Sequence, residues 1–311
     1  MSSLIDPAAP PATNTVPTCS VVLATMQGLT PEKATRLRLL DQQVADLGGE
    51  LLVGSGVAHT GPRDRSDWRA TIWFEVPGAG TFVLRRLALE HSRGAVVVIS
   101  EDHCDHPDGW LATLLASHRA HPDADVIVAR VDNGTDETAI DRASFWINAG
   151  HLRRPMNPRR AARQIPITGA SFKRAALERL LSAHPTLPPE LILPEDLRRH
   201  GLRIVVDASF GITHVQTATW ARHGSGHFHN ARAGAGVTRL RRARTWVRLG
   251  TSPVFTLARW ARALRDARQR GHPLSEILSV APALAWLYCA KAAGEWVGAL
   301  SGPGDSATRL E

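Results

Sequence analysis

Short runs of β-forming residues alternate with helical patterns through the first 130 residues. Thr30, Pro31 and Glu32 supply a helix N-cap, a proline at the first helical position and an early acid, which predicts a helix to about Leu47. Strands that recur with helices between them predict a mainly parallel sheet built from right-handed crossovers. We therefore expect an α/β fold with helices on both faces of the sheet. The predicted strands are 20–24, 50–53, 71–75, 95–99 and 125–131.

The pattern changes after residue 131. A strand-like run at 167–171 leads into a predicted helix at 173–183, and 202–207 and 211–214 read as two short strands. We predict three parts: a disordered lead-in at 1–17 without signal-peptide features, an α/β domain at 18–220, and a helical region at 221–311.

The charge of the chain is unevenly distributed. The formal net charge is +8, yet residues 221–270 hold twelve arginines and one acid, while the rest of the chain has 25 basic and 28 acidic residues. Such a split predicts that one region meets a polyanion or an anionic membrane. A hydrophobic content of 43% excludes a disordered chain, and three widely spaced cysteines indicate a reducing, cytoplasmic compartment.

The C-terminal third has two apolar patterns. Residues 255–264 form an amphipathic basic helix, the type that lies on anionic membrane surfaces. The apolar run 277–290 contains Pro282 and has fourteen residues, fewer than the roughly 20 that span a bilayer. It predicts a re-entrant, interfacial or core helix, and an ordinary helical subdomain packed on the sheet remains the alternative.

Metal-ligand residue types follow the apolar run 96–99. Glu101, Asp102 and His103 come directly after it, and a Pro/Gly turn and an apolar helix beginning near Asp108 follow. Ligands bind at the carboxyl ends of strands in open α/β sheets. Glu101 and His103 are two residues apart, so their side chains point the same way in an extended chain and can reach one divalent cation. The alternative is a solvated acidic turn.

Together these motifs resemble family 2 glycosyltransferases of the GT-A (Rossmann-like) fold over about residues 20–216. The resemblance rests on Glu101 to His103 with the following Gly-Trp-Leu, on 169–174, and on an acid followed by Arg-Arg-His-Gly201 and a strand that ends in His214. It implies a DXD-type element, similar to the DXH variant, in which Glu101 and His103 bind the metal and Asp102 the ribose-diphosphate. His214 would be a further metal ligand, or else a hydrogen-bonded structural histidine.

The resemblance also implies a general base for an inverting transfer. The acid eleven residues before Gly201 is Glu190, which we take as the base, with Asp196 as the alternative. Either carboxylate could instead cap the following helix.

Further contacts to the nucleotide-sugar are implied at the ends of other strands. The chain departs from the family pattern at 53–56, which holds no carboxylate, and at Glu101, where the family has aspartate. Gly169 to Ser171 would line the acceptor side. The residues implied in donor or acceptor binding are Ala24, Ser55, Pro77, Gly78, Arg85, Asp102, Gly169, Ala170 and Ser171.

The sequence thus predicts a bacterial-type glycosyltransferase of the hexosyltransferase class. It would use Mn²⁺ or Mg²⁺ to move a sugar from a nucleotide diphosphate-sugar to a glycan or lipid-linked acceptor, at the inner face of the cytoplasmic membrane. The rival hypothesis is a catalytically inactive GT-A-fold protein that binds membrane or polyanion through its arginine-rich region. Nucleic acid is the less favoured polyanion, because that region lacks interleaved aromatic residues.

Overall fold

The computed structural model describes residues 16–26, 28–58, 68–135, 137–152, 168–183, 197, 199–239, 245–306 and 309. The chain divides into two compact units. The first comprises Met1–Asp132 and His151–Val215, and the second comprises Asn133–Gly150 and Gln216–Glu311.

The first unit is built on a mixed sheet with the strand order β3-β2-β1-β4-β7-β6-β8-β5. Its first four strands in the chain are parallel, as in the pairing of Val21 with both Leu51 and Val98. The pairings of β4 with β7, β7 with β6 and β8 with β5 are antiparallel. The strands are β1 (Cys19–Thr25), β2 (Glu50–Ser55), β3 (Thr71–Glu75), β4 (Val96–Ile99), β5 (Cys104–Asp105), β6 (Val126–Asn133), β7 (Ala170–Lys173) and β8 (Ile204–His214).

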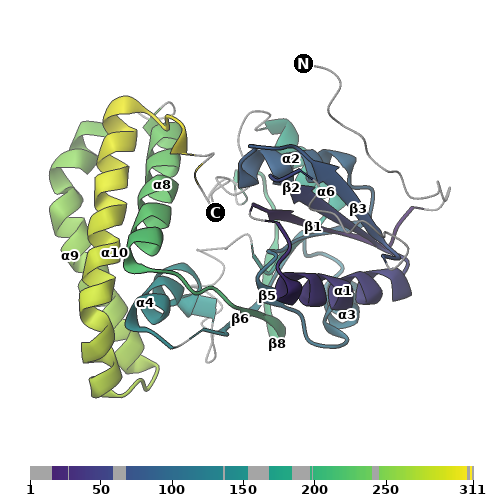
Figure 1. Ribbon diagram of the computed structural model, residues 1–311, viewed down its shortest axis with the longest axis horizontal. Helices are drawn as coiled ribbons and strands as arrows, with labels where there is room; N and C mark the ends of the chain where they lie inside the picture. The colour runs from purple at the N-terminus through teal and green to yellow at the C-terminus, as the bar shows by residue number, and fades with distance from the viewer. Residues whose placement is uncertain are drawn as a thin grey trace. The chain divides into compact units, whose positions relative to one another are not determined.

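Helices cover both faces of this sheet, which confirms the predicted α/β class. In Figure 1, α2 and α6 lie on one face of the sheet and α1 and α3 on the other. Thr30 caps α1 as predicted, because its hydroxyl accepts a hydrogen bond from the Lys33 amide at 3.3 Å. The helices are α1 (Pro31–Asp46), α2 (Thr81–His91), α3 (Trp110–Ala120) and α6 (Arg174–Ala183).

The prediction of two short strands at 202–207 and 211–214 was wrong, because β8 is continuous. Gly211 suggested a break between two strands, but glycine at this position instead allows β8 and β6 to approach each other closely. A Cβ at Gly211 would lie 2.6 Å from the carbonyl oxygen of Arg130 on β6. The Arg130 side chain also donates a hydrogen bond to the Ala208 carbonyl at 3.1 Å, which holds the middle of β8 in place.

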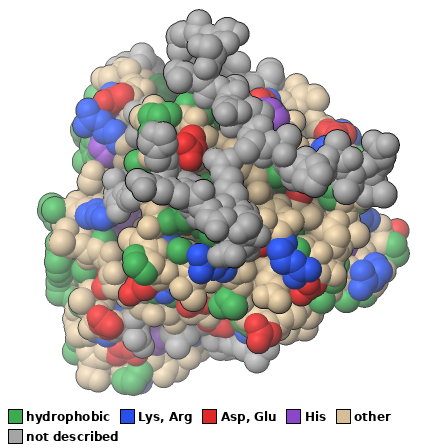
Figure 2. Space-filling model, turned by 45° about the vertical axis from the view of Figure 1, so that its right-hand side comes forward, with side chains coloured by type: hydrophobic (Ala, Val, Ile, Leu, Met, Phe, Trp, Pro, Cys, Tyr) green, Lys and Arg blue, Asp and Glu red, His purple; other side chains and the backbone are tan. Residues whose placement is uncertain are grey.

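Basic and acidic side chains are interspersed on the face shown in Figure 2. They form no single-sign patch among the described side chains on that face, in keeping with the charge balance outside the arginine-rich region.

The second unit is helical. Residues 133–150, which the sequence analysis placed in the α/β domain, belong to it: Ile140 and Ala143 of α4 pack in one core with Val280, Ala283, Leu284 and Leu287 of α10. The elements are α4 (Ala139–Asn148), α8 (Trp220–Arg239), α9 (Thr245–Gln269) and α10 (Leu274–Ser301), with a 3₁₀ turn at Gly150–Leu152 where the chain re-enters the first unit.

Helices α8 and α10 approach each other closely because α10 carries glycine at two contact points. A Cβ at Gly294 would lie 2.1 Å from the Phe228 carbonyl oxygen, and one at Gly298 would lie 2.3 Å from that of Arg232. Two glycines four residues apart place one smooth stripe on a helix, which lets a partner backbone lie against it.

Helix α10 is longer than the apolar run that predicted it. It spans 28 residues, and among the described residues it is the one helix long and apolar enough to cross a membrane. Val280, Leu284 and Leu287 are fully buried, whereas Leu278 and Trp286 are exposed. Length and composition alone therefore do not distinguish a membrane helix from a core helix in this unit.

Candidate functional site

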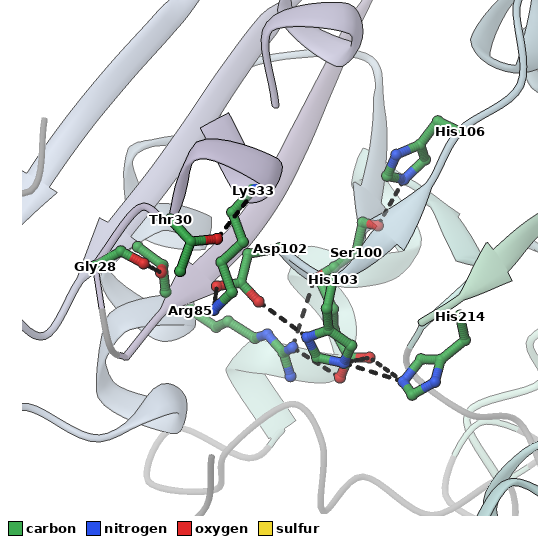
Figure 3. Close-up of polar contacts among 11 residues, drawn as sticks. Gly28, Thr30, Lys33, Arg85, Ser100, Asp102, His103, His106 and His214 are labelled. Atoms are coloured by element: carbon green, nitrogen blue, oxygen red, sulfur yellow. Dashed lines mark hydrogen bonds and ion pairs between the residues drawn. The ribbon is translucent and has the colours of Figure 1, made fainter. Parts of the chain in front are cut away.

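Three side chains with metal-binding atoms converge at one edge of the sheet (Figure 3). The Nε2 atoms of His103 and His214 lie 3.1 Å apart. A single oxygen of Glu101, Oε2, lies 3.3 Å from the His103 nitrogen and 3.2 Å from the His214 nitrogen. These three atoms form a nearly equilateral triangle.

Strand pairing brings the two histidines together. The chain leaves β4 at Ile99, turns through Glu101 to His103, and enters β5, which pairs antiparallel with the end of β8. In that register Cys104 lies opposite His214, and the Val215 amide donates to the His103 carbonyl at 2.9 Å. The site is therefore fixed by backbone hydrogen bonds rather than by flexible loops.

The triangle fits a divalent first-row metal ion. Ligand atoms bonded at about 2.0 to 2.2 Å to one ion lie about 2.8 to 3.1 Å apart in octahedral geometry and about 3.3 to 3.6 Å apart in tetrahedral geometry. The three observed separations, 3.1, 3.2 and 3.3 Å, fall within the span of these two ranges. Two imidazoles and one carboxylate on one face also leave the remaining coordination positions open for substrate oxygens.

Asp102 supports this triangle from behind. It is 5% exposed. One carboxylate oxygen accepts from His103 Nδ1 at 2.9 Å and the other accepts from Lys33 Nζ at 2.6 Å. A carboxylate on Nδ1 directs the Nε2 atom of the same ring toward a metal and orients the ring. Both oxygens of Asp102 are thus engaged by His103 and Lys33, and the ribose-diphosphate contact implied by the resemblance stays a prediction.

Arg85 also contacts the triangle rather than an open surface. It is 5% exposed, and its Nη2 atom donates to Glu101 Oε1 at 3.1 Å. The other oxygen of Glu101 therefore points to the histidines. Arg85 thus orients a candidate ligand, in contrast to the nucleotide contact implied for it.

The charges in the site shift two pKa values in opposite directions. Burial disfavours the charged form of His103, but Glu101 and Asp102 outweigh it and raise the pKa of His103 to about 9. Burial likewise acts to raise the pKa of Glu101, but His103, His214 and Arg85 hold it well below its usual range. Without a metal, the site is thus an ion pair between an imidazolium and a carboxylate.

The hydrogen bonds from Lys33 through Asp102 to His103 should affect how tightly the site binds a metal ion. Asp102→Asn or Lys33→Met is expected to weaken Mn²⁺ binding by about 10- to 100-fold, because the ligating imidazole loses its orienting partner. Isothermal titration calorimetry or electron paramagnetic resonance of added Mn²⁺ measures this directly. Asp105→Asn is the matched control: Arg36 on α1 pairs with Asp105 at 2.5 Å in the same way, but among the described residues the Asp105 side chain bonds to none of Glu101, His103 and His214. Equal losses in both variants would contradict the positioning role.

Ala24, Ser55, Pro77 and Gly78 lie at the carboxyl ends of the parallel strands, as predicted. Ala24 is near the end of β1, and Ser55 ends β2. The turn after β3 lies along the end of β2, because the Gly78 amide donates to the Gly56 carbonyl at 2.9 Å. Pro77 and Gly78 are exposed, whereas Ser55 is buried and bonds the backbone of Val57.

Gly169, Ala170 and Ser171 lie on or just before β7, opposite the end of β4. All three are buried, and Ser171 is 0% exposed. Its hydroxyl lies 2.8 Å from His118 Nε2 and donates to the Ile127 carbonyl at 3.3 Å. The Ser171 side chain therefore faces the core, not an acceptor.

His118 should make the stability of the first unit sensitive to pH. Burial and nearby Lys173 lower the pKa of His118 to about 4. The unfolded chain then binds more protons than the folded protein, so stability falls as pH drops below about 6.5 and continues to fall until about 4. Between pH 7 and pH 5, His118 should cost about 2 kcal/mol of unfolding free energy. Urea denaturation of His118→Gln at both pH values should show a smaller drop than wild type; an equal drop would contradict the prediction.

The candidate general bases Glu190 and Asp196 lie outside the described residues. Lys33, in contrast, was missed by the sequence reasoning. Its signal was available: it lies in the first turn of the helix that follows β1, and such turns lie at the edge of the sheet where ligands bind.

A family model matches the segment of the chain that holds Glu101 and His103. Residues 72–181 match the family model described as Glycosyl transferase family 2. That range contains β4, the turn with Glu101 and His103, α3, β6 and β7. A crystal structure of S. aureus TarS 1-349 aligns with a TM-score of 0.48 and 13% sequence identity, over 90% of this chain and 90% of that chain. A search of curated proteins finds no match.

The matched segment contains the strand and the turn that supply two of the three converging ligand atoms, and the expected α/β architecture surrounds them. Residues 72–181 are therefore similar to family 2 glycosyltransferases, and they lie in a chain with an α/β sheet and a C-terminal set of helices.

Proposed function

We propose that the protein is a metal-dependent, inverting glycosyltransferase that uses a nucleotide diphosphate-sugar. The observation that carries the proposal is the triangle of Glu101, His103 and His214 at the edge of the sheet. A divalent cation held there would neutralise the charge that develops on the departing diphosphate. The protein's own part is to hold three ligand atoms on one side of the ion and to leave the other side open.

The ligand set favours Mn²⁺ over Mg²⁺. Magnesium prefers oxygen ligands and keeps several waters, whereas imidazole nitrogens suit first-row transition metals. Two of the three ligand atoms here are imidazole nitrogens. We therefore infer that manganese supports the reaction better than magnesium does.

We propose Glu190 as the general base, with Asp196 as the alternative. An inverting transfer needs one carboxylate that accepts the proton of the acceptor hydroxyl as the new glycosidic bond forms. The donor nucleotide is proposed to lie along the turns at 54–57 and 77–80, where exposed Pro77 and Gly78 let the backbone approach it. The absence of a carboxylate at 53–56 means that base and ribose would be bound by backbone groups there.

A location at the inner face of the cytoplasmic membrane, with a glycan or lipid-linked acceptor, is part of the proposal. Three observations support it: twelve arginines with one acid at 221–270, exposed Val254, Phe255 and Leu257 on α9, and the length of α10. Each arginine close to an anionic membrane surface contributes on the order of 1 kcal/mol of binding free energy.

A thermal-shift screen tests the enzymatic proposal. Nucleotide diphosphates and their sugar conjugates are added to the full chain with Mn²⁺, with Mg²⁺ or with a chelator. We expect one nucleotide to raise the melting temperature with Mn²⁺, less with Mg²⁺, and not with the chelator, because specific ligands stabilise the native state. If no nucleotide shifts the melting temperature under any condition, the proposed donor class is wrong.

The second candidate function is a catalytically inactive protein that binds an anionic membrane. The same exposed residues on α9 favour it. Vesicle binding together with no response to any nucleotide diphosphate-sugar and Mn²⁺ would select this candidate. A metal-dependent response to a nucleotide would reject it.

A further inference from the structure

Helices α9 and α10 leave an apolar groove between them. The groove has a volume of about 790 Å³ and is partly open to solvent. Its lining is almost entirely hydrocarbon and aromatic, and it includes Leu257 and Trp260 of α9 and Tyr288, Cys289, Ala293 and Trp296 of α10. The volume lies within the range of small-molecule sites in proteins.

The groove exists because α10 packs differently on its two neighbours. In Figure 1, α10 lies between α8 and α9. On the α8 side, Gly294 and Gly298 let the backbones approach. On the α9 side, the indole of Trp260 reaches across to α10 and donates to the Ala281 carbonyl at 3.0 Å. Because the bulky Trp260 ring lies between α9 and α10 at this level, the two helices leave a gap along the rest of their length.

The lining determines the chemistry of an occupant. Sugars and nucleotides need polar partners, and an apolar wall leaves their hydroxyl and phosphate groups without hydrogen bonds. A hydrocarbon chain loses nothing there and gains burial. The α10 lining runs from Ala285 to Val297, which is about 18 Å of helix and close to the roughly 15 Å hydrocarbon depth of one membrane leaflet.

A cluster of cations follows the groove along α9. Arg262, Arg265 and Arg268 come directly after the last groove residue on this helix, Trp260, and all three are exposed. Their guanidinium groups make no ion pair or hydrogen bond within the part of the chain that the structure describes. Helix α9 is therefore apolar beside the groove and cationic beyond it. This pattern is complementary to an anionic lipid, which has an apolar chain and a negatively charged headgroup.

Several large apolar side chains on these two helices are exposed. Val254, Phe255 and Leu257 on α9 are 71%, 54% and 64% exposed, and Trp296 and Leu300 on α10 are 42% and 47% exposed. Exposed apolar clusters next to basic residues are typical of surfaces that lie in the headgroup region of a membrane.

We propose that this groove takes the acyl chain of an anionic phospholipid, with Arg262, Arg265 and Arg268 at its phosphate. The inference rests on the membrane association proposed above and names the surface that makes it. It does not depend on the metal site, so glycosyl transfer and lipid binding can fail independently.

Cys289 provides a probe inside the groove. It is exposed and lines the groove, whereas Cys19 and Cys104 are buried. Burial raises the pKa of both buried thiols, that of Cys19 to about 11, so a water-soluble maleimide should react with Cys289 first. The rate of that reaction in the full chain therefore reports whether the groove is filled.

The experiment compares two kinds of vesicle. Alkylation of Cys289 is followed with vesicles of phosphatidylglycerol mixed with phosphatidylcholine, and with vesicles of phosphatidylcholine alone, while sedimentation measures the bound fraction. We expect the anionic vesicles to slow alkylation about tenfold or more and the zwitterionic vesicles to leave it nearly unchanged.

Two matched pairs of variants locate the effect. Ala293→Glu places a carboxylate in the groove and Ala221→Glu places the same charge on an exposed position of α8 outside it; only the first should abolish protection of Cys289. Replacing Arg262, Arg265 and Arg268 with glutamine should reduce vesicle binding about tenfold or more. The same replacement at the exposed Arg69, Arg179 and Arg203 of the first unit, with an equal change in net charge, should not.

Four outcomes would overturn the inference. Vesicle binding with unprotected Cys289 would leave membrane association standing and reject the groove. No vesicle binding would reject both. Protection that rises with protein concentration in the absence of lipid, together with self-association, would make the groove an interface between copies. Protection by a soluble isoprenoid phosphate but not by phosphatidylglycerol would assign it to the acceptor instead.

Discussion

Replacing His103 with alanine is expected to lower kcat/KM for sugar transfer by about 100-fold or more. The substitution removes one of three ligand atoms that lie 3.1 to 3.3 Å from one another. It also leaves Asp102 paired with Lys33 alone. Steady-state kinetics with saturating Mn²⁺ measure the loss, and a titration with Mn²⁺ shows whether a higher metal concentration recovers part of it.

His121→Ala is the matched control for that experiment. His121 is exposed at the end of α3, and its ring nitrogen bonds a backbone carbonyl of its own helix. This variant should keep wild-type kinetics and wild-type metal dependence. If His103→Ala behaved like His121→Ala, the triangle would have no role in the reaction and the metal-dependent mechanism would be abandoned.

Gly294→Ala is expected to destabilise the helical unit by about 3 kcal/mol or more, enough to lower its yield or to unfold it at physiological temperature. The new Cβ would lie 2.1 Å from the Phe228 carbonyl oxygen on α8, and a backbone atom cannot move aside as a flexible side chain can. Helices α8 and α10 would have to separate, which opens a gap along their contact.

Gly226→Ala provides the opposite expectation in the same unit. Gly226 lies inside α8, and nothing lies within 4 Å of a Cβ placed there. Alanine has the higher helix propensity, so this variant should be stabilised by about 0.5 to 1 kcal/mol. Thermal or urea unfolding followed by circular dichroism compares the two. Similar effects of the same sign would show that close packing at Gly294 does not hold the helices together.

Much of the fold was predictable because its signals are local. The run 96–99, the Thr30 cap and the Pro/Gly turn before α3 each act on neighbouring residues, and the structure shows the corresponding elements. The antiparallel half of the sheet was not predictable in this way, because strand direction depends on pairing partners far away in sequence. Residues 133–150 illustrate the same limit: the apolar face of α4 fits many partners, and only the tertiary structure shows that it packs on α10.

In the candidate site, too, some features were predictable from the sequence and others were not. The residue types at Glu101, His103 and His214 were found from the sequence, and the structure brings all three together, while their role as metal ligands stays a prediction. The orientation of single side chains was not available. The hydrogen bonds of Asp102 to Lys33 and His103 were not predicted; Ser171 was expected to line the acceptor site and faces the core. Alternation along a strand predicts which residues share a face, but not which hydrogen bonds satisfy a buried oxygen or hydroxyl.

The short pairing of β5 with β8 determines when the three proposed metal ligands can meet. His103 and His214 are 111 residues apart in the sequence, and they meet only after the last strand of the sheet has docked. A polypeptide that emerges from the ribosome as far as β7 holds one histidine and one carboxylate without their partner. Tight binding of a metal ion at the proposed site would therefore mark the end of sheet assembly, and its appearance during refolding would time the arrival of β8.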